Sequence, residues 1–584
     1  MSLGEPSSSN SVLRLPSNDV ADCVLLLKKP KQVVYILGSV FLRKVAGALS
    51  IHGHDLADDE WHPACSISPN LVTVECSSSR RVKYSSELLS DIVDNETKRA
   101  AQFELKNNKN VGCVVYLKAN QLRLRFQCQD LFDISSIFTE GVGLNRPEIQ
   151  SKTADLGFTL FFELPTAFSP LVVSPTWTNI SGHIKSYTSK KGVHPPVVLI
   201  CGGKNVGKST FARYLMNKLL NTQKPLCYLE TDVGQSEFTP PAVLSLTKVE
   251  TPIFAPPYLH LSKPERAFFF GEVSPKDRPS TYVQLIHILY EYYNRYCQEM
   301  PLIVNTCGWV KGMGVRILLD IIRIVQPSHV IQINSESQPI KNLPLLNEEF
   351  LLSEEGWSHR VDENSSLPSP QIYQLVAFEN TVEMTKGPGL VASELRSLSL
   401  LSYFGSPQSD SSNLSIPEYI LKYCTVYSIS LANLHLCSVC DDICPGDILH
   451  SVIGSVVGLV KKDEELSGCI DLKNTDALPL HRIQYGECVG LGIVRNVDAV
   501  KQLLYIITPE SLEVLKTVQV LVKGRLEILD CLYKKQTYGK LPYVTSEFTY
   551  NHRGSGQKRI RYNLLRQRTP YSPKPKEERI NNLT

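Results

Sequence analysis

The sequence lacks long apolar runs and a large excess of either charge. Its 584 residues carry a net charge of only +3, and 42% of them are hydrophobic. No apolar run approaches the roughly 20 residues that a membrane-spanning helix needs. The Ser-rich segment Ser7–Ser11 does not resemble the apolar core of a secretory signal. We therefore expect an intracellular protein with no membrane partner, and its overall charge does not by itself indicate a polyanionic ligand.

Paired cysteine motifs are scarce, although the chain has 16 cysteines. Most of these are scattered, which is typical of buried thiols in a reducing compartment. One C-x-x-C pair, Cys437 and Cys440, has His435 and Cys444 nearby, but no second pair follows at the spacing of a zinc site. Buried or incidental cysteines are thus the favoured interpretation, and a zinc site is the alternative.

A glycine-rich motif is the most informative stretch that the chain does have. Residues 202–209 read G-G-K-N-V-G-K-S, which matches the phosphate-loop pattern G-x-x-x-x-G-K-[ST]. The apolar run Val197–Cys201 before it predicts a buried strand, and Thr210–Leu220 after it has the apolar spacing of a helix. Strand, loop and helix are the setting in which backbone N–H groups and a helix N-terminus bind phosphates. The alternative is a chance match at a strand-to-helix turn.

The predicted nucleotide-binding residues are the loop and the first residues of the helix. They are Gly202, Gly203, Lys204, Asn205, Val206, Gly207, Lys208, Ser209 and Thr210. In such loops the lysine reaches the β- and γ-phosphates and the hydroxyl that follows it binds Mg²⁺. These roles fall to Lys208 and Ser209.

A second predicted strand ends in an acidic motif. The run Leu226–Leu229 is followed by Glu230–Gln235, which reads E-T-D-V-G-Q. In phosphate-loop proteins an acid at the end of a neighbouring strand binds Mg²⁺ directly or through water. Asp232 suits that role, or the role of a base that takes a proton from an attacking hydroxyl, and Gln235 suits orientation of water. The alternative is a turn-forming aspartate, which is common beside glycine.

A third predicted strand ends in a motif with a tryptophan. The run Leu302–Asn305 is followed by Thr306–Trp309, which reads T-C-G-W. In an open α/β sheet, ligands bind at the carboxyl ends of the strands, and a tryptophan there can stack on a nucleic-acid base. A packing role for Trp309 is the alternative.

Together these three motifs resemble the phosphate loop, the D-x-D-x-G-Q motif and the T-x-G-W clasp of the polynucleotide 5′-hydroxyl kinases. The segments Ser236–Pro241 (S-E-F-T-P-P) and Leu541–Thr545 (L-P-Y-V-T) favour the nucleolar branch that processes pre-ribosomal RNA over the messenger-RNA cleavage-factor subunit. The resemblance is strong over residues 195–320, weaker toward the C-terminus and vague over the N-terminal third.

The resemblance implies transfer of the γ-phosphate of ATP or GTP to the 5′-hydroxyl of RNA, in processing of the internal transcribed spacer. Lys208 and Ser209 then serve the nucleotide and Mg²⁺. Asp232 becomes the Mg²⁺-linked acid and candidate base, and Gln235 helps to place metal or water. Such chemistry depends on positioning and charge neutralisation more than on covalent help.

The resemblance also implies partners and a location. Thr306, Gly308 and Trp309 would grip the RNA end. The family works beside an endoribonuclease whose cut leaves a 5′-hydroxyl end, so such a subunit is an expected partner, docked mostly through the outer domains. The expected location is the nucleus and nucleolus.

Two positions depart from the family pattern. The first acid of the D-x-D motif is Glu230, which keeps the charge but adds a methylene group. The family's R-x-x-x-R lid aligns with Ser393–Phe404, where Arg396 fits but Leu400 occupies the second arginine position. An arginine at a transferring phosphoryl group is worth about 10³–10⁵ in rate. The absence of the second lid arginine therefore predicts either weaker kinase activity or another residue in its place. For Arg396, the alternative to a catalytic role is a solvated residue on a helix surface.

The predicted fold class is α/β: a central P-loop NTPase parallel sheet with helices, flanked by a β-rich N-terminal domain and a β-rich or mixed C-terminal domain. The predicted boundaries are a disordered N-terminus (1–21), the β-rich domain (22–168), the kinase domain (169–405), a linker (406–416), the C-terminal domain (417–550) and a basic tail (551–584). The tail suits RNA phosphates or nuclear import, with a merely solvated segment as the alternative.

Two other functions compete with the kinase. A scaffold subunit of an RNA-processing complex would bind the nucleotide with little or no turnover, and the missing lid arginine favours it. A simple NTPase or GTPase switch is the other, but the chain has no N-K-x-D-type guanine motif, and Thr306–Trp309 has no evident role in a switch.

Overall fold

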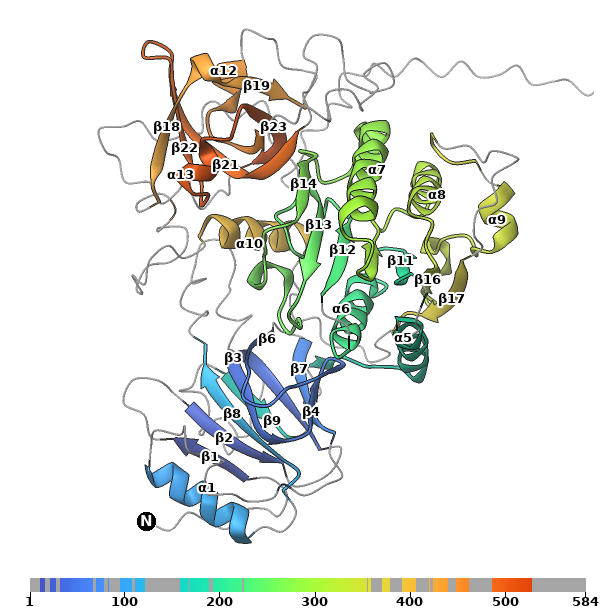
Figure 1. Ribbon diagram of the computed structural model, residues 1–584, viewed down its shortest axis with the longest axis vertical. Coiled ribbons are helices and arrows are strands. Elements are labelled where there is room, and N and C mark those ends of the chain that lie inside the picture. Colours follow the sequence, from blue (N-terminus) through green and yellow to red (C-terminus); the bar gives the residue numbers. More distant parts are fainter. Residues whose placement is uncertain are drawn as a thin grey trace, which may run out of the picture.

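The structure of the protein is a computed structural model (Figure 1). It describes residues 11–15, 22–27, 32–66, 70–77, 82, 95–107, 111–120, 158–165, 168–188, 192, 194–222, 225–353, 355–358, 370–378, 391–405, 420, 424–439, 448–461 and 486–527. The predicted linker, the basic tail, Cys440 and Cys444 lie outside these ranges.

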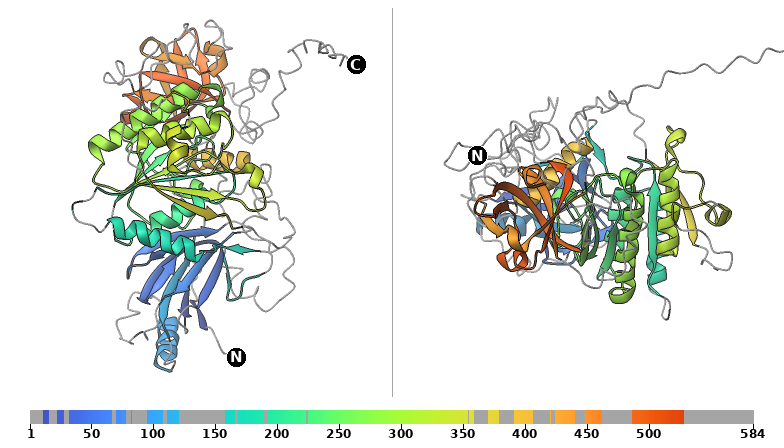
Figure 2. Two further views of the ribbon diagram at one scale, coloured as in Figure 1. Left: turned by 90° about the vertical axis from the view of Figure 1, so that its right-hand side faces the viewer. Right: turned by 90° about the horizontal axis from the view of Figure 1, so that it is seen from above.

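Three sheets follow one another along the chain and are stacked along the long axis of the molecule (Figures 1 and 2). A ten-stranded sheet comes first, a seven-stranded sheet with helices occupies the middle, and a six-stranded sheet comes last. This arrangement confirms the predicted fold class, whereas the domain boundaries stay predictions.

In its described residues, the N-terminal part is a sheet with one helix. Its elements are β1 (Ser11–Leu15), β2 (Asp22–Leu27), β3 (Val33–Gly47), β4 (Leu49–Ile51), β5 (His54–Asp55), β6 (Trp61–Ser66), β7 (Asn70–Cys76), α1 (Asn95–Asn107), β8 (Cys113–Ala119), β9 (Phe158–Phe161) and β10 (Ser169–Pro170). Strand β3 pairs with β6, β7, β8 and β9, so it connects most of the sheet. Alternate residues of β3, among them Val40 and Leu42, enter the main core of this part.

Three details of this part differ from the predictions. The segment 1–21 is not wholly disordered, because β1 pairs with β2 and extends the sheet at that edge. Residues 95–107 form α1, which the sequence pattern missed; among the helix residues whose burial is described, Ala101 and Leu105 are the buried ones, and charged side chains surround them. Strand β10 pairs with β7, so Ser169–Pro170 belong to the N-terminal sheet although the predicted boundary assigns them to the kinase domain.

The central part alternates strands and helices. Its elements are α5 (Pro175–Thr188), β11 (Val197–Gly202), α6 (Lys208–Leu219), β12 (Leu226–Glu230), β13 (Val243–Val249), η2 (Pro257–Leu259), β14 (Arg266–Phe269), η3 (Pro275–Asp277), α7 (Pro279–Tyr296), β15 (Leu302–Asn305), α8 (Met313–Val325), β16 (His329–Asn334), η4 (Pro339–Lys341), α9 (Glu348–Ser353), β17 (Gln371–Val376) and α10 (Ala392–Phe404). Residues of α5 and α6 pack on one face of the sheet, and residues of α7 and α8 pack on the other.

The order of the central sheet is β14-β13-β12-β15-β11-β16-β17. Strands β12, β15, β11, β16 and β17 are parallel, and β13 and β14 add an antiparallel edge that the prediction of a parallel sheet did not include. Ile200 of β11 and Glu230 of β12 both pair with Asn305 of β15. The three sequence motifs therefore leave adjacent strands at the same edge of the sheet.

The C-terminal part is a mostly antiparallel sheet with short helices. Its elements are β18 (Val426–Ser430), η5 (Leu431–Asn433), β19 (His435–Ser438), α12 (Ile448–Val452), β20 (Ser455–Lys461), β21 (Glu487–Asp498), β22 (Leu503–Ile507), α13 (Leu512–Leu515) and β23 (Val520–Glu527). It joins the central part through a shared core and through Arg525, which contacts Glu272 at 3.2 Å and Asp277 at 2.8 Å.

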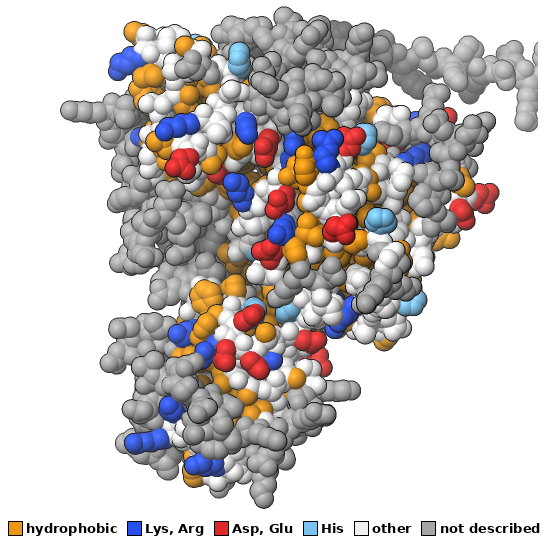
Figure 3. Space-filling view, in the orientation of Figure 1, with side chains coloured by type: hydrophobic (Ala, Val, Ile, Leu, Met, Phe, Trp, Pro, Cys, Tyr) orange, Lys and Arg blue, Asp and Glu red, His pale blue; other side chains and the backbone are white. Residues whose placement is uncertain are grey.

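The described surface is mixed in charge. On the face drawn in Figure 3, basic and acidic side chains are interspersed over the three parts, as the small net charge implies. Within the described ranges, no helix combines the length and the apolar character that crossing a membrane requires.

Candidate active site

The phosphate loop has the backbone geometry that its motif predicts. Gly207 has a φ of 95°, a left-handed conformation that favours glycine, and α6 begins at the next residue. Lys208 folds back over the loop and its Nζ donates a hydrogen bond to the carbonyl of Gly203 at 2.6 Å. Burial lowers the pKa of Lys208, and the carboxylate of Asp232 opposes this shift. The lysine and the aspartate are therefore close enough to interact.

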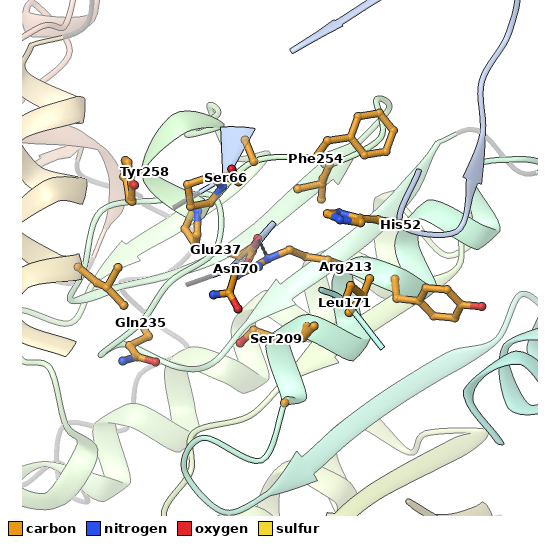
Figure 4. Close-up of a pocket in the computed structure, with 18 of the residues that line it drawn as sticks. His52, Ser66, Asn70, Leu171, Ser209, Arg213, Gln235, Glu237, Phe254 and Tyr258 are labelled. Carbon is orange, nitrogen blue, oxygen red and sulfur yellow. Dashed lines mark hydrogen bonds and ion pairs between the residues drawn. The ribbon is translucent and has the colours of Figure 1, made fainter. Parts of the chain in front are cut away.

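A cavity of 650 Å³ opens beside the loop (Figure 4). The phosphate loop and α6 form one wall with Ser209 and Thr210, and the N-terminal sheet forms another with Asn70. Gln235 and Arg396 complete the lining on the side of the acidic motif and α10. The structure thus brings together Ser209, Thr210, Gln235 and Arg396, which the sequence assigned to one site.

The N-terminal part is attached to the back of the phosphate-loop helix. The Asn217 side chain of α6 is fully buried; its Nδ2 donates to the carbonyls of His52 (3.3 Å) and Ile253 (2.9 Å). The ring of His54 donates to the carbonyl of Asn217 at 3.1 Å. The N–H of Cys65 donates to the carbonyl of Phe254 at 3.1 Å. These contacts hold the N-terminal sheet in place as a wall of the cavity, and the sequence pattern did not predict that wall.

Asp232 shapes the acidic loop with one oxygen and keeps the other free. Its Oδ1 accepts hydrogen bonds from the N–H groups of Gly234 (2.9 Å) and Gln235 (3.2 Å). Its Oδ2 has no partner within the described part of the chain. The turn that was the alternative for Asp232 therefore exists and still leaves one oxygen for a ligand.

Glu230 is a buried anchor of the same loop. It is 1% exposed, and its carboxylate accepts from the N–H groups of Asp232 (2.8 Å) and Glu237 (2.9 Å) and from the amide of Asn305 (3.2 Å). Burial raises its pKa well above the usual value. The extra methylene group lets this acid span the loop, so Glu230 positions Asp232 and does not itself face the cavity.

The clasp motif divides into a buried and an accessible half. The Thr306 hydroxyl donates to the carbonyl of Ile200 at 2.8 Å and the residue is 2% exposed, so it holds the clasp to β11 and a direct RNA contact does not fit. A side chain at Gly308 would lie 2.9 Å from the backbone nitrogen of Lys204, so glycine lets the clasp touch the phosphate loop. Trp309 is partly buried against the core beside α8.

The two lid positions, Arg396 and Leu400, have different environments. One face of α10 lines the cavity with Leu395, Arg396 and Ser399. Arg396 is half-buried, burial lowers its pKa, and the Asp232 carboxylate opposes that shift, so a fully solvated helix residue does not fit, and its catalytic role stays a prediction. Leu400 is 5% exposed in the core that α10 shares with the C-terminal sheet. The second lid position is therefore committed to packing.

The oxygen atoms beside the loop fit a magnesium ion bound with a nucleotide. Mg²⁺ prefers oxygen ligands and is usually bound by one or two protein groups plus phosphates. The Ser209 hydroxyl lines the cavity, and neither it nor Oδ2 of Asp232 has a hydrogen-bond partner among the described residues. Elsewhere in those residues no cluster of three or more His, Cys, Asp or Glu side chains is arranged to hold a metal. The alternative of zinc at Cys437 involves Cys440 and Cys444, which are outside the described ranges.

Sequence reasoning missed an ion-pair cluster below the cavity. The Nε of Arg213 on α6 donates to Oε1 of Glu237 at 2.6 Å, and the ring of His260 donates to the same oxygen at 3.0 Å. Glu237 and Arg213 both line the cavity. A signal was available, because Arg213 lies four residues after Ser209 and thus on the same face of the helix. Glu237 had no such signal, since its partners come from two other elements.

The cluster of Arg213, Glu237 and His260 should make the stability of the fold depend on pH. Burial alone would raise the pKa of Glu237, but Arg213 and His260 lower it from 4.5 to about 2. The ionised carboxylate therefore stabilises the fold above about pH 4.5, and this contribution disappears as the pH falls toward about 2, with a total of up to about 3 kcal/mol. We expect the stability gap between wild type and Glu237→Gln to narrow from about pH 6 to about pH 3 in urea unfolding. An unchanged gap would contradict the assignment.

Comparison with known proteins agrees with this geometry. The mRNA cleavage and polyadenylation factor CLP1 P-loop family matches residues 202–349, and the NOL9-like C-terminal domain matches residues 422–529. A chain in the solved structure of the wild-type Clp1p–Pcf11p complex has a TM-score of 0.50 at 13% identity and covers 88% of this chain and 98% of that one. That likeness shows a shared fold.

Relatives with curated names are more similar in sequence. Polynucleotide 5′-hydroxyl-kinase NOL9 of Danio rerio is 31% identical over 78% of this chain, and that of Homo sapiens is 33% identical over 62%. The matches span 64% and 54% of the length of those two relatives. The relative of the same name from Arabidopsis thaliana is 32% identical over 63% of this chain and 95% of its own length. The chain therefore belongs to the family of the NOL9 polynucleotide 5′-hydroxyl-kinases.

Proposed function

We propose that the protein is a polynucleotide kinase that transfers the γ-phosphate of ATP or GTP to the 5′-hydroxyl end of RNA. One observation carries the proposal. Three adjacent parallel strands, β11, β12 and β15, end at one edge of the sheet in the phosphate loop, the acidic loop and the clasp. Phosphoryl transfer needs this combination, since the donor, a metal-binding acid and the acceptor must meet in line.

The reaction is an in-line displacement. The 5′-oxygen of RNA attacks the γ-phosphorus, the bond from that phosphorus to the β-bridging oxygen breaks, and the nucleoside diphosphate leaves. Asp232 accepts the hydroxyl proton through Oδ2, the oxygen that the loop leaves free. Lys208 and Arg396 neutralise the phosphate oxygens. Gln235 orients water beside them.

Magnesium, when bound, neutralises charge on the β- and γ-phosphate oxygens. Ser209 would hold it directly and Asp232 through a water molecule, which leaves Oδ2 of Asp232 to take the hydroxyl proton. Glu230 supports this by fixing the backbone of Asp232 from below.

On the acceptor side we propose that Trp309 and the backbone at Gly308 contact the RNA end, while Thr306 keeps the clasp in place. By family membership the RNA is a pre-ribosomal spacer cut to a 5′-hydroxyl end, the partner is the endoribonuclease that cuts it, and the location is the nucleolus. The name of the relatives, polynucleotide 5′-hydroxyl-kinase NOL9, supports the kinase, and we propose the spacer, the partner and the location in addition.

Transfer of labelled γ-phosphate to a short 5′-hydroxyl RNA tests the function. The matched acceptor is the same RNA with a 5′-phosphate, which has no hydroxyl to accept the group. We expect label on the first RNA and none on the second, with Mg²⁺ required. Nucleotide binding without label on either RNA, even with a 5′-hydroxyl-generating endoribonuclease present, would instead support the nucleotide-binding scaffold, which the packing of Leu400 favours.

A further inference from the structure

Two cationic side chains line the cavity among the described residues, and only one of them belongs to a motif. Arg396 comes from α10, at the first lid position. Arg213 comes from α6, one turn after Ser209. Because Leu400 is packed in the core, α10 supplies no second arginine from its lid position. Arg213 is therefore the other guanidinium available to a ligand in this cavity.

The Arg213 side chain is held on one side and open on the other. Its Nε donates to Glu237 at 2.6 Å, and Glu237 is in turn fixed by His260 at 3.0 Å. The Glu237 side chain is 2% exposed, whereas that of Arg213 is 29% exposed. With Nε directed at Glu237, the two terminal NH₂ groups of Arg213 have no hydrogen-bond partner among the described residues.

Arg213 lines the same cavity as residues of the phosphate loop, among them Asn205 and Gly207. Side chains on a helix lean toward its N-terminus, so the head of Arg213 lies over the turn that contains Ser209 and Thr210. Figure 4 shows Arg213 extending to Glu237, and Asn70 of β7 lines the same cavity from the N-terminal sheet. A fixed guanidinium loses little freedom on binding and matches two phosphate oxygens at once.

We propose that Arg213 binds the α- and β-phosphate oxygens of the nucleotide on the side of the N-terminal sheet, which leaves Arg396 to the transferred γ-phosphoryl group. The inference rests on the proposed use of a nucleotide. Arg213 lies more than one turn after Lys208 along α6 and lines the cavity together with residues of the N-terminal sheet, whereas no residue of the clasp lines it. Glu237 and His260 act as positioning residues, since they touch the arginine and not the phosphates.

Calorimetric titration of the full chain with ATP and with ADP, without RNA, tests the assignment. Arg213→Gln should weaken both nucleotides by about 10- to 100-fold, the range for a hydrogen-bonded charged contact. Arg213→Lys keeps a charge for Glu237 but loses the fork, so it should weaken both by a smaller factor. Arg99→Gln on α1 removes an exposed arginine far from the cavity and should leave both affinities unchanged. In transfer assays the KM for ATP should rise in the Arg213 variants while the KM for RNA stays constant.

The two nucleotides separate the outcomes. Equal losses for ATP and ADP support the α/β assignment, whereas a loss for ATP alone would move Arg213 to the γ-phosphate and overturn it. Unchanged affinities in both variants would also overturn it. If Arg213→Gln fails to fold, Arg213→Lys carries the test. A wild type that binds both nucleotides but transfers no phosphate would refute the kinase, while the affinities still decide the role of Arg213.

Discussion

Replacing Lys208 with alanine is expected to lower phosphoryl transfer by about 10³-fold or more while the fold persists. Removal of one preorganised charge-stabilising group costs about 10²–10³ in rate, and Lys208 would serve both binding and transfer. Lys208 is 8% exposed, but its Nζ makes one hydrogen bond among the described residues, to the carbonyl of Gly203, so we expect the fold to tolerate its loss. Label transfer to 5′-hydroxyl RNA and thermal unfolding, measured on the same preparation, check both parts of the prediction.

The matched control for this variant is Lys248→Ala. Lys248 is a surface residue of β13 whose ion pair with Glu250 (2.9 Å) is solvent-exposed, and such pairs contribute little. We expect unchanged transfer. Transfer that survives in Lys208→Ala, with the unfolding temperature of the wild type, would show that the phosphate loop is not the donor site.

Restoring the family's second lid arginine by Leu400→Arg is expected to destabilise the protein by about 4 kcal/mol or more, without a gain in activity. Leu400 is 5% exposed among apolar residues of α10 and the C-terminal sheet, including Leu491 and Ile493. Loss of a buried leucine costs about 2–5 kcal/mol, and an unpaired buried charge adds to that. Urea unfolding gives the stability, and the transfer assay gives the rate.

Leu400→Met controls for the disturbance of packing, because it conserves volume and should cost less than about 1.5 kcal/mol. If Leu400→Arg instead folds normally and transfers phosphate faster than wild type, position 400 faces the site after all. The assignment of the second lid position to the core would then be wrong.

The sequence was sufficient where the physics is local. The run Val197–Cys201 and the helix after the loop appear as β11 and α6, because a short apolar run and a helical spacing each specify one element. The convergence of Ser209 and Gln235 also followed, since parallel strands bring their carboxyl ends to one edge, whereas Arg396 on α10 was expected only from the family resemblance.

Properties set by contacts between distant elements were not predictable. Thr306 looked accessible in its motif, yet its hydroxyl is bonded to β11, 106 residues earlier. Leu400 looked like a lost arginine until the C-terminal sheet was seen to cover it. The proposed role of Arg213 depends on Glu237, which lies just after the acidic motif and fixes the guanidinium. Helix α1 was missed because its apolar periodicity is weak: among its residues whose burial is described, Ala101 and Leu105 are the buried ones.

The attachment of the N-terminal sheet to α6 has a consequence for the modularity of the chain. Asn217 satisfies carbonyls on both sides of the boundary, at His52 and at Ile253, and α10 is covered from the other end by the C-terminal sheet. The central part therefore depends on the N-terminal sheet for one wall of its cavity and on the C-terminal sheet to cover the apolar face of α10. Evolution cannot exchange the flanking parts for unrelated modules without also redesigning the helix that follows the phosphate loop, so the three parts are expected to be inherited as one unit.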